Sequence, residues 1–241
     1  MKAFAVLYFL ATLALLPARA QTVHVVSEST PFTYMQDGKP AGRAMELVEQ
    51  SLQKAGLADY HVSIYPWARS YDLALKEPNV LIFLIARTPA REPLFKWAGE
   101  FLRIQYHFYK LRDRPDIVIR NLDDARAYTV GVVRDDVRHQ YLQARGFTKL
   151  VVSGQNLDNF RKLMNRQVQI VPMPDTDVSQ MCEQAPFDCS HLERLYTLDE
   201  ITSSLQMAYS RSTPDAVVDR TRAAFQKLAT EGVVKRVMDR K

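Results

Sequence analysis

The chain has 241 residues, of which 47% are hydrophobic and 24% charged, and its formal net charge is +5. This composition is typical of a globular protein that buries a sizeable core, in one large domain or two smaller ones. The charge is too mild, and the basic residues too evenly mixed with acidic ones, for a nucleic-acid-binding surface.

The first 20 residues are predicted to be a secretory signal peptide. Lys2 precedes an apolar run from 3 to 16, which is followed by a proline and the small-residue pattern of residues 18 to 20. The run is shorter than the roughly 18 apolar residues of a membrane span. The residue directly after Ala20 is Gln21 and not a cysteine that could carry a lipid anchor. We therefore expect cleavage after Ala20 and export to the periplasm.

After this segment, strand patterns alternate with helix patterns. Apolar spacing and branched side chains predict strands at 23–27, 62–65 and 80–86, and amphipathic spacing predicts helices from Ala44 to Gly56 and from Pro66 to Pro78. Alternation of this kind indicates a largely parallel sheet covered by helices.

A second unit follows the extended aromatic segment 101–111. Its predicted elements are a short helix at 122–125, a strand at 128–133, a helix at 137–145, a strand at 150–153, a helix at 156–164 and a strand at 168–172. The tail is predicted to form a strand at 205–210, a helix at 213–228 and a last short helix after Gly232.

The strand at 80–86 is apolar throughout and ends at polar Arg87-Thr88, so it brings charge to its carboxyl end. Open α/β sheets bind ligands at that end of their strands. Arg91 follows within one turn, and its planar guanidinium is suited to paired hydrogen bonds with a carboxylate. Because it leaves the sheet here, we expect Arg91 to add little to core packing.

The buried strand, the pattern Thr88-x-x-Arg91 and the segment 95–97 resemble the periplasmic solute-binding proteins of polar amino-acid ABC importers (family 3). Residues 31–56, 130–142 and 213–241 extend the resemblance over nearly all of the mature chain.

The resemblance implies an α/β, two-lobed periplasmic-binding-protein-like fold (type II), in which each lobe is a mostly parallel sheet covered by helices. Lobe 1 would comprise 21–108 plus 199–241, and lobe 2 would comprise 109–198. A two-strand hinge, with crossings near 105–112 and 195–203, would let the lobes close on a ligand.

The resemblance also implies roles for individual residues. Arg91 would grip the carboxylate of the ligand, and Trp67 would line the cleft. Arg69 and Arg87 are expected to converge on the same site, and Glu28 and Tyr34 are candidates for its wall.

The sequence departs from the family at three places. Asp135 and Asp136 replace a Gly-Thr pair, and these aspartates are expected to cap the helix at 137–145. Leu84 and Ala86 stand where the family has a hydroxyl. The acid that would bind an amino group of the ligand is either Asp175 or Asp177.

Two cysteines, Cys182 and Cys189, have six residues between them. In an exported protein this spacing predicts a disulfide. A metal site that adds His191 is the alternative, but it has no fourth nearby ligand.

We therefore expect a monomeric binding protein, not an enzyme, with no cofactor, that captures a small polar solute and delivers it to a membrane ABC permease. A soluble sensor for a membrane receptor and an exported dehydratase-like enzyme on the same fold are the alternatives.

Overall fold

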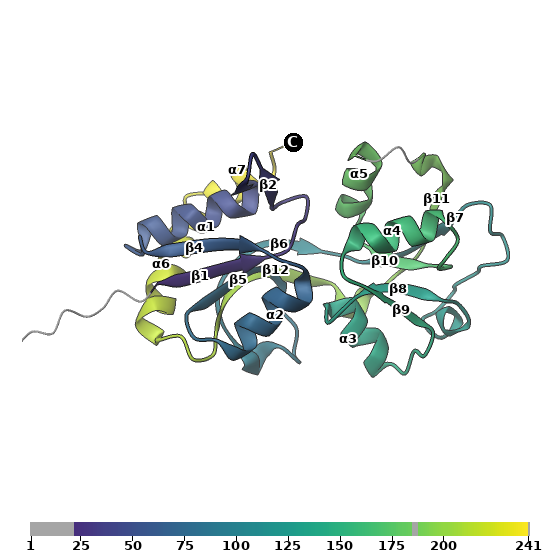
Figure 1. Ribbon diagram of the computed structural model, residues 1–241, viewed down its shortest axis with the longest axis horizontal. Coiled ribbons are helices and arrows are strands. Elements are labelled where there is room, and N and C mark those ends of the chain that lie inside the picture. Colours follow the sequence, from purple (N-terminus) through teal and green to yellow (C-terminus); the bar gives the residue numbers. More distant parts are fainter. Residues whose placement is uncertain (1–21, 185–187, 241) are drawn as a thin grey trace, which may run out of the picture.

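A computed structural model describes residues 22–184 and 188–240 of the chain. The predicted signal peptide lies outside the described residues. Two lobes stand side by side, joined by a narrow connection (Figure 1). Within the described ranges, no helix is both long and apolar enough to cross a bilayer.

Lobe 1 is built on a five-stranded sheet in the order β4-β1-β5-β12-β6. Its strands are β1 (Val23–Ser27), β4 (Tyr60–Ile64), β5 (Val80–Ala86), β6 (Phe95–Ile104) and β12 (Ser203–Ser210). The strands β4, β1 and β5 pair in parallel, and β12 runs antiparallel to both of its neighbours, β5 and β6. The sheet is therefore mostly parallel, as expected from the sequence, and its one antiparallel strand is β12, which returns from lobe 2.

Helices cover both faces of this sheet. On one face lie α1 (Arg43–Lys54), α6 (Asp215–Thr230) and α7 (Val233–Met238), which pack with Leu81 and Phe83 of β5. On the other face lies α2 (Trp67–Lys76), which packs with Ile82 and Ile85. Strand β5 is apolar throughout because both of its faces are covered.

A β-bulge interrupts β5 close to its carboxyl end. The pairing with β12 passes from Phe83 to Ile85 and leaves Leu84 unpaired, with a left-handed φ of 60°. Bulges of this kind redirect a strand and are common beside binding sites. This one lies just before the turn that carries Arg91.

Lobe 2 combines the sheet β10-β7-β11 with the parallel pair β8-β9. Its strands are β7 (His107–Leu111), β8 (Val130–Val133), β9 (Leu150–Ser153), β10 (Val171–Met173) and β11 (Leu192–Thr197). A parallel bridge between Val130 and Ile170 links the two groups. Its helices are α3 (Val137–Ala144), α4 (Asn156–Met164) and α5 (Asp175–Gln184).

Four elements of the fold were not expected from the sequence. They are α5, β11 and the hairpin of β2 (Tyr34–Gln36) and β3 (Lys39–Ala41), which turns at Asp37-Gly38.

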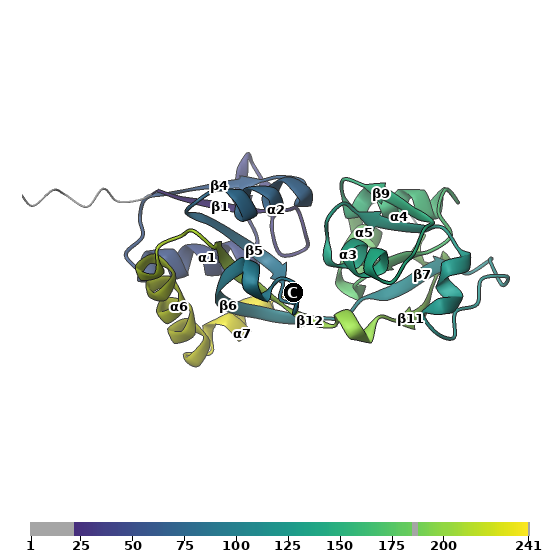
Figure 2. The ribbon, with the colours of Figure 1, turned by 90° about the horizontal axis from the view of Figure 1, so that it is seen from below.

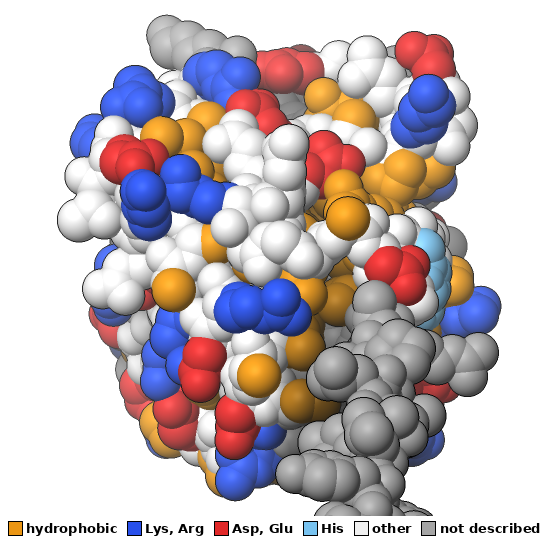
Figure 3. Space-filling view, turned by 90° about the vertical axis from the view of Figure 1, so that its left-hand side faces the viewer, with side chains coloured by type: hydrophobic (Ala, Val, Ile, Leu, Met, Phe, Trp, Pro, Cys, Tyr) orange, Lys and Arg blue, Asp and Glu red, His pale blue; other side chains and the backbone are white. Residues whose placement is uncertain are grey.

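Two adjacent segments connect the lobes, as Figure 2 shows from below. One runs from β6 to β7 through residues 105–106, and the other runs from β11 to β12 through 198–202, which include the short helix η4 (Asp199–Ile201). The amide of Leu198 donates to the carbonyl of Tyr106 at 2.8 Å and joins the two segments. On the face of lobe 1 turned away from lobe 2, basic and acidic side chains are interspersed (Figure 3).

Candidate functional site

The site lies where the two lobes meet, and Arg91 is its most deeply buried charge. After β5, the amide of Arg91 donates to the carbonyl of Thr88 at 3.0 Å, which forms a turn before the short helix η1 (Glu92–Leu94). The turn directs the side chain toward lobe 2, where it is 1% exposed. The expectation that Arg91 adds little to packing is therefore wrong.

Aromatic rings and neutral acceptors surround the guanidinium of Arg91. Its central carbon lies 4.9 Å from the ring centre of Tyr71 and 5.5 Å from that of Trp67. Its nitrogens donate to Gln140 Oε1 at 3.0 and 3.3 Å and to the carbonyls of Asp135 and Ala86 at 3.3 and 3.4 Å. Burial lowers the pKa of Arg91, while Tyr71 and Asp136 oppose this shift.

Trp67 begins α2 immediately after Pro66 and also reaches lobe 2. Its ring stacks on Tyr71 at 5.7 Å, and its Nε1 donates to the carbonyl of Asp135 at 3.0 Å. Asp135 has a left-handed φ of 59°, which an aspartate tolerates. The backbone of Asp135 therefore contacts Trp67 and Arg91, while its side chain is half exposed.

Asp136 and Arg138 form a buried ion pair at the start of α3. Asp136 accepts from the amide of His139 at 2.9 Å, so it caps α3 as expected. Arg138 also donates to the carbonyl of Pro172 at 3.0 Å and to Asn156 Oδ1 at 2.9 Å. Burial alone would lower the pKa of Arg138, but Asp136 and Tyr106 outweigh it and raise that pKa.

Two further carboxylates share this environment. Burial between the lobes raises the pKa of Glu28 to about 8; Arg138 opposes the shift, and Asp136 and Asp177 reinforce it. Burial also raises the pKa of Asp177 to about 6, again against Arg138. The cluster of Glu28, Asp136 and Asp177 therefore contains more acidic than basic groups around Arg138, and Glu28 keeps its proton at neutral pH.

The structure separates the two candidate acids of α5. Asp177 is buried in the charged cluster and accepts from Asn156 Nδ2 at 3.2 Å. Asp175 is half exposed and accepts from the hydroxyl of Tyr109 and from Arg194 Nη1 at 3.3 Å. Asp177 is thus the acid that shares the buried cluster with Glu28.

Arg69 and Arg87 do not join Arg91, so the predicted convergence of three guanidiniums does not occur. Arg69 is exposed and lies over the ring of Tyr65 at 4.0 Å. Arg87 pairs with Glu92 at 2.6 Å and lies over Trp97 at 5.2 Å. Each is held by partners within lobe 1.

A hollow of about 500 Å³ opens beside the buried cluster and is lined by both lobes. Lobe 1 contributes Tyr34, which is 38% exposed, together with Phe32 and Arg43. Lobe 2 contributes one side of α5, including Asp175 and Glu183. Asp175 and Tyr34, both predicted site residues, therefore lie at this opening and not in the buried cluster.

The sequence interpretation missed four residues that complete the site: Tyr71, Tyr106, Arg138 and Gln140. Helical spacing alone could have found two of them. Tyr71 lies four residues after Trp67, and Gln140 lies four residues after Asp136, so each shares a helix face with a predicted residue. Leu84 and Ala86 offer no hydroxyl here, and Ala86 contributes only its carbonyl.

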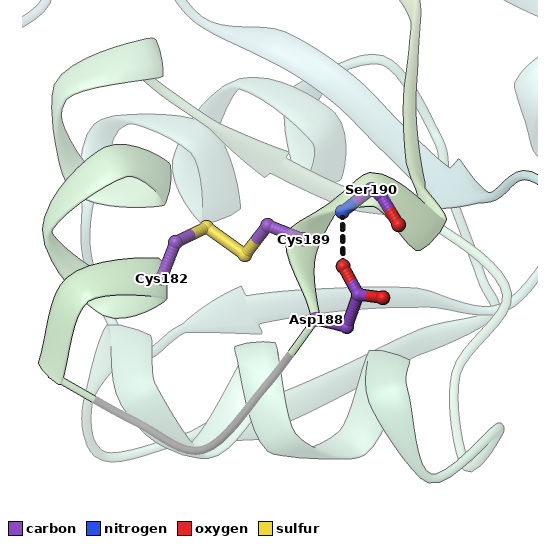
Figure 4. The surroundings of a disulfide bond; sticks show 4 residues. All are labelled: Cys182, Asp188, Cys189 and Ser190. Carbon is purple, nitrogen blue, oxygen red and sulfur yellow. Dashed lines mark hydrogen bonds between the residues drawn. A yellow bond between two sulfur atoms is a disulfide. The ribbon is translucent and has the colours of Figure 1, made fainter.

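The predicted disulfide between Cys182 and Cys189 is present (Figure 4). It ties α5 to the short helix η3 (Cys189–His191), which Asp188 caps by accepting from the amide of Ser190 at 2.9 Å. Among the described residues, no group of three or more His, Cys, Asp or Glu is placed to hold a metal ion.

Sequence comparisons reveal no relative: no family model and no curated protein matches the chain. Solved structures do match. A histidine kinase sensor domain with similarity to periplasmic binding proteins is 18% identical, with a TM-score of 0.78 over 91% of this chain and 95% of its own.

Two binding proteins are similarly close in structure. The arginine-, lysine-, histidine-binding protein ArtJ from Geobacillus stearothermophilus is 16% identical, with a TM-score of 0.75 over 90% of this chain and 93% of its own. AbpA, an amino acid ABC transporter substrate-binding protein from Streptococcus pneumoniae bound to L-arginine, is 16% identical, with a TM-score of 0.72 over the same shares. The chain therefore has the two-lobed α/β fold of periplasmic binding proteins.

Proposed function

We propose that this protein is an exported solute-binding protein that captures a small polar, carboxylate-bearing solute between its lobes and delivers it to a membrane ABC importer. The observation that carries the proposal is the position of Arg91. A guanidinium that is 1% exposed lies between the lobes, and every protein atom to which it donates belongs to a neutral group.

The chemistry of Arg91 supports an anionic ligand group. A buried cation without a charged partner is costly, and a carboxylate would supply that partner through two parallel hydrogen bonds. Around Arg138, the pKa values of Glu28 and Asp177 are raised, and a cationic ligand group would lower them, so this side of the site favours such a group. A solute with one carboxylate and one ammonium group, such as an amino acid, would satisfy both sides.

Closure is the proposed means of capture. Trp67 and Arg91 of lobe 1 contact α3 and Asp135 of lobe 2, and only two segments connect the lobes. A ligand held from both sides would favour the closed arrangement through its differential affinity. Binding, rather than catalysis, is proposed, and turnover of a bound solute would overturn that part.

The similarity to a histidine kinase sensor domain favours a second candidate. The same closing movement would then be read by a membrane receptor and would not deliver a solute. Reconstitution with candidate permeases and receptors would separate the two, because only an importer subunit stimulates ATP-driven uptake.

A thermal-shift screen tests the proposal. The panel should contain amino acids, small carboxylic acids and polyamines. A ligand that binds only the folded state adds about 2.7 kcal/mol at 100 times its dissociation constant. A shift that Arg91→Ala abolishes would support the carboxylate site. If no charged metabolite shifts the wild type, the proposal fails.

A further inference from the structure

We propose that Gln140 acts as a built-in competitor for the ligand: its side-chain amide occupies the edge of the Arg91 guanidinium that a carboxylate would take, and this contact holds the lobes together when no ligand is bound. The competition half of this inference rests on the proposed function, whereas the contact between the lobes does not.

The geometry of the contact resembles that of a bound carboxylate. Nε and Nη2 lie on one edge of a guanidinium, the edge that commonly pairs with carboxylates. In Arg91 both nitrogens donate to Gln140 Oε1, at 3.3 and 3.0 Å. The remaining nitrogen, Nη1, donates within lobe 1 to the carbonyl of Ala86. Gln140 therefore occupies the edge that faces lobe 2, and the carbonyl of Asp135 accepts a further bond from Nη2 at 3.3 Å.

The strength of the contact suits a displaceable partner. Charge-assisted bonds to a carboxylate are shorter, about 2.7 to 2.9 Å, and roughly twice as strong as neutral ones. The amide oxygen of Gln140 is neutral and accepts at 3.0 and 3.3 Å. A ligand carboxylate can thus replace it with a net gain, but the apparent affinity is lowered by the fraction of molecules in which Gln140 holds the edge.

The chain supplies a matched control on the same helix. Gln140 lies one turn after the cap residue Asp136, and its backbone N–H donates to the carbonyl of Asp136 at 3.0 Å. The side chain of Gln140 is half buried. Gln143 also belongs to α3 but is exposed. Substitution of either residue by alanine removes a glutamine side chain from the same helix, and of the two only Gln140 contacts Arg91.

Small-angle X-ray scattering of the ligand-free protein tests the contact directly. Gln140→Ala and the bulkier Gln140→Leu should both increase the radius of gyration relative to wild type, whereas Gln143→Ala should leave it unchanged. If both Gln140 variants are as compact as wild type, Gln140 does not hold the lobes together and the inference is overturned.

Calorimetric titration tests the competition, with L-arginine, L-glutamine and succinate as probes. For any probe that wild type binds, Gln140→Ala should bind at least about fivefold more tightly, because the competitor is gone. Gln140→Glu should bind more weakly, because a carboxylate then occupies the edge permanently. Weaker binding by Gln140→Ala would show that Gln140 serves the ligand and would overturn the inference.

Failure of the proposed function can be distinguished from failure of the inference about Gln140. If no probe binds to wild type or to any variant, the proposed function fails for these solutes. The scattering comparison decides the contact between Gln140 and Arg91 in either case.

Discussion

The guanidinium carbon of Arg91 lies 4.9 Å from the ring centre of Tyr71, four residues beyond Trp67 on the same helix. A desolvated cation over an aromatic face gains about 2 kcal/mol or more, which offsets part of the cost of burying the charge. The aromatic residues of α2 thus hold Arg91 in place before any ligand arrives.

Arg91→Ala is expected to reduce both binding and stability. Loss of the buried partner of a carboxylate should cost about 2 to 5 kcal/mol of binding, or some 30-fold to several thousand-fold in affinity. Stability should fall by about 1 to 3 kcal/mol, because hydrogen bonds and ring contacts to both lobes are lost. Titration calorimetry and urea unfolding measure the two effects. Wild-type affinity in Arg91→Ala would contradict the assignment.

Arg69→Ala and Arg87→Ala should bind the solute within about twofold of wild type. Arg69 lies over Tyr65 on the outer side of lobe 1, and Arg87 is paired with Glu92. Surface ion pairs are worth about 0 to 1 kcal/mol, so stability should change little. These variants serve as controls of equal charge for Arg91→Ala. A loss of affinity comparable to that of Arg91→Ala would move the site toward the start of α2 or the end of β5.

Glu28→Gln is expected to flatten the pH dependence of stability. Because the pKa of Glu28 rises from 4.5 to about 8, the folded protein keeps a proton that the unfolded chain releases, and the free energy of unfolding falls as the pH rises through this window. Asp177 acts with the same sign between pH 3.8 and about 6. Glu28 keeps part of its surface exposed, so the effect should be smaller than the full shift implies.

Melting temperatures between pH 5 and 8.5 measure this effect. Wild type should lose stability toward pH 8, and Glu28→Gln should be the more stable protein there. Glu49→Gln, on the exposed side of α1, is the control and should follow wild type. A wild type that gains stability between pH 5 and 8 would contradict the burial of Glu28 as a protonated carboxyl group.

Reduction of the disulfide between Cys182 and Cys189 should leave the protein folded. The bond closes a short loop, which corresponds to about 2 to 3 kcal/mol in the chain-entropy description. Its loss should lower the melting temperature without removing the cooperative transition. A thiol reagent should label the denatured, unreduced protein at neither cysteine, and labelling at both would show that the bond does not form in solution.

The regular elements of both lobes could be predicted because each has a strong local pattern. The apolar run at 80–86 and the amphipathic spacing after Ala44 correspond closely to β5 and α1. The helix α5 was missed because its apolar spacing is weak: polar residues such as Asp177 and Gln180 lie among Val178 and Met181.

The site was predictable only where a residue's role depends on its own strand or helix. Arg91 and Trp67 follow from their positions at the end of β5 and the start of α2. Gln140 and Arg138 could not be found in this way, because their roles depend on how lobe 2 approaches lobe 1. The sequence pattern also does not reveal that the carbonyl of Asp135 faces Arg91, or that Arg87 pairs with Glu92.

Tyr106 belongs to one of the two connecting segments, and its backbone carbonyl accepts the hydrogen bond from Leu198 of the other. Its ring lies against the guanidinium of Arg138, 5.2 Å from ring centre to carbon, and its hydroxyl is buried among the charges of the cleft. The connection between the lobes and the charge cluster thus share one residue. If the lobes close as proposed, a change in the pairing of Arg138 would act on the connecting segment through its direct contact with Tyr106.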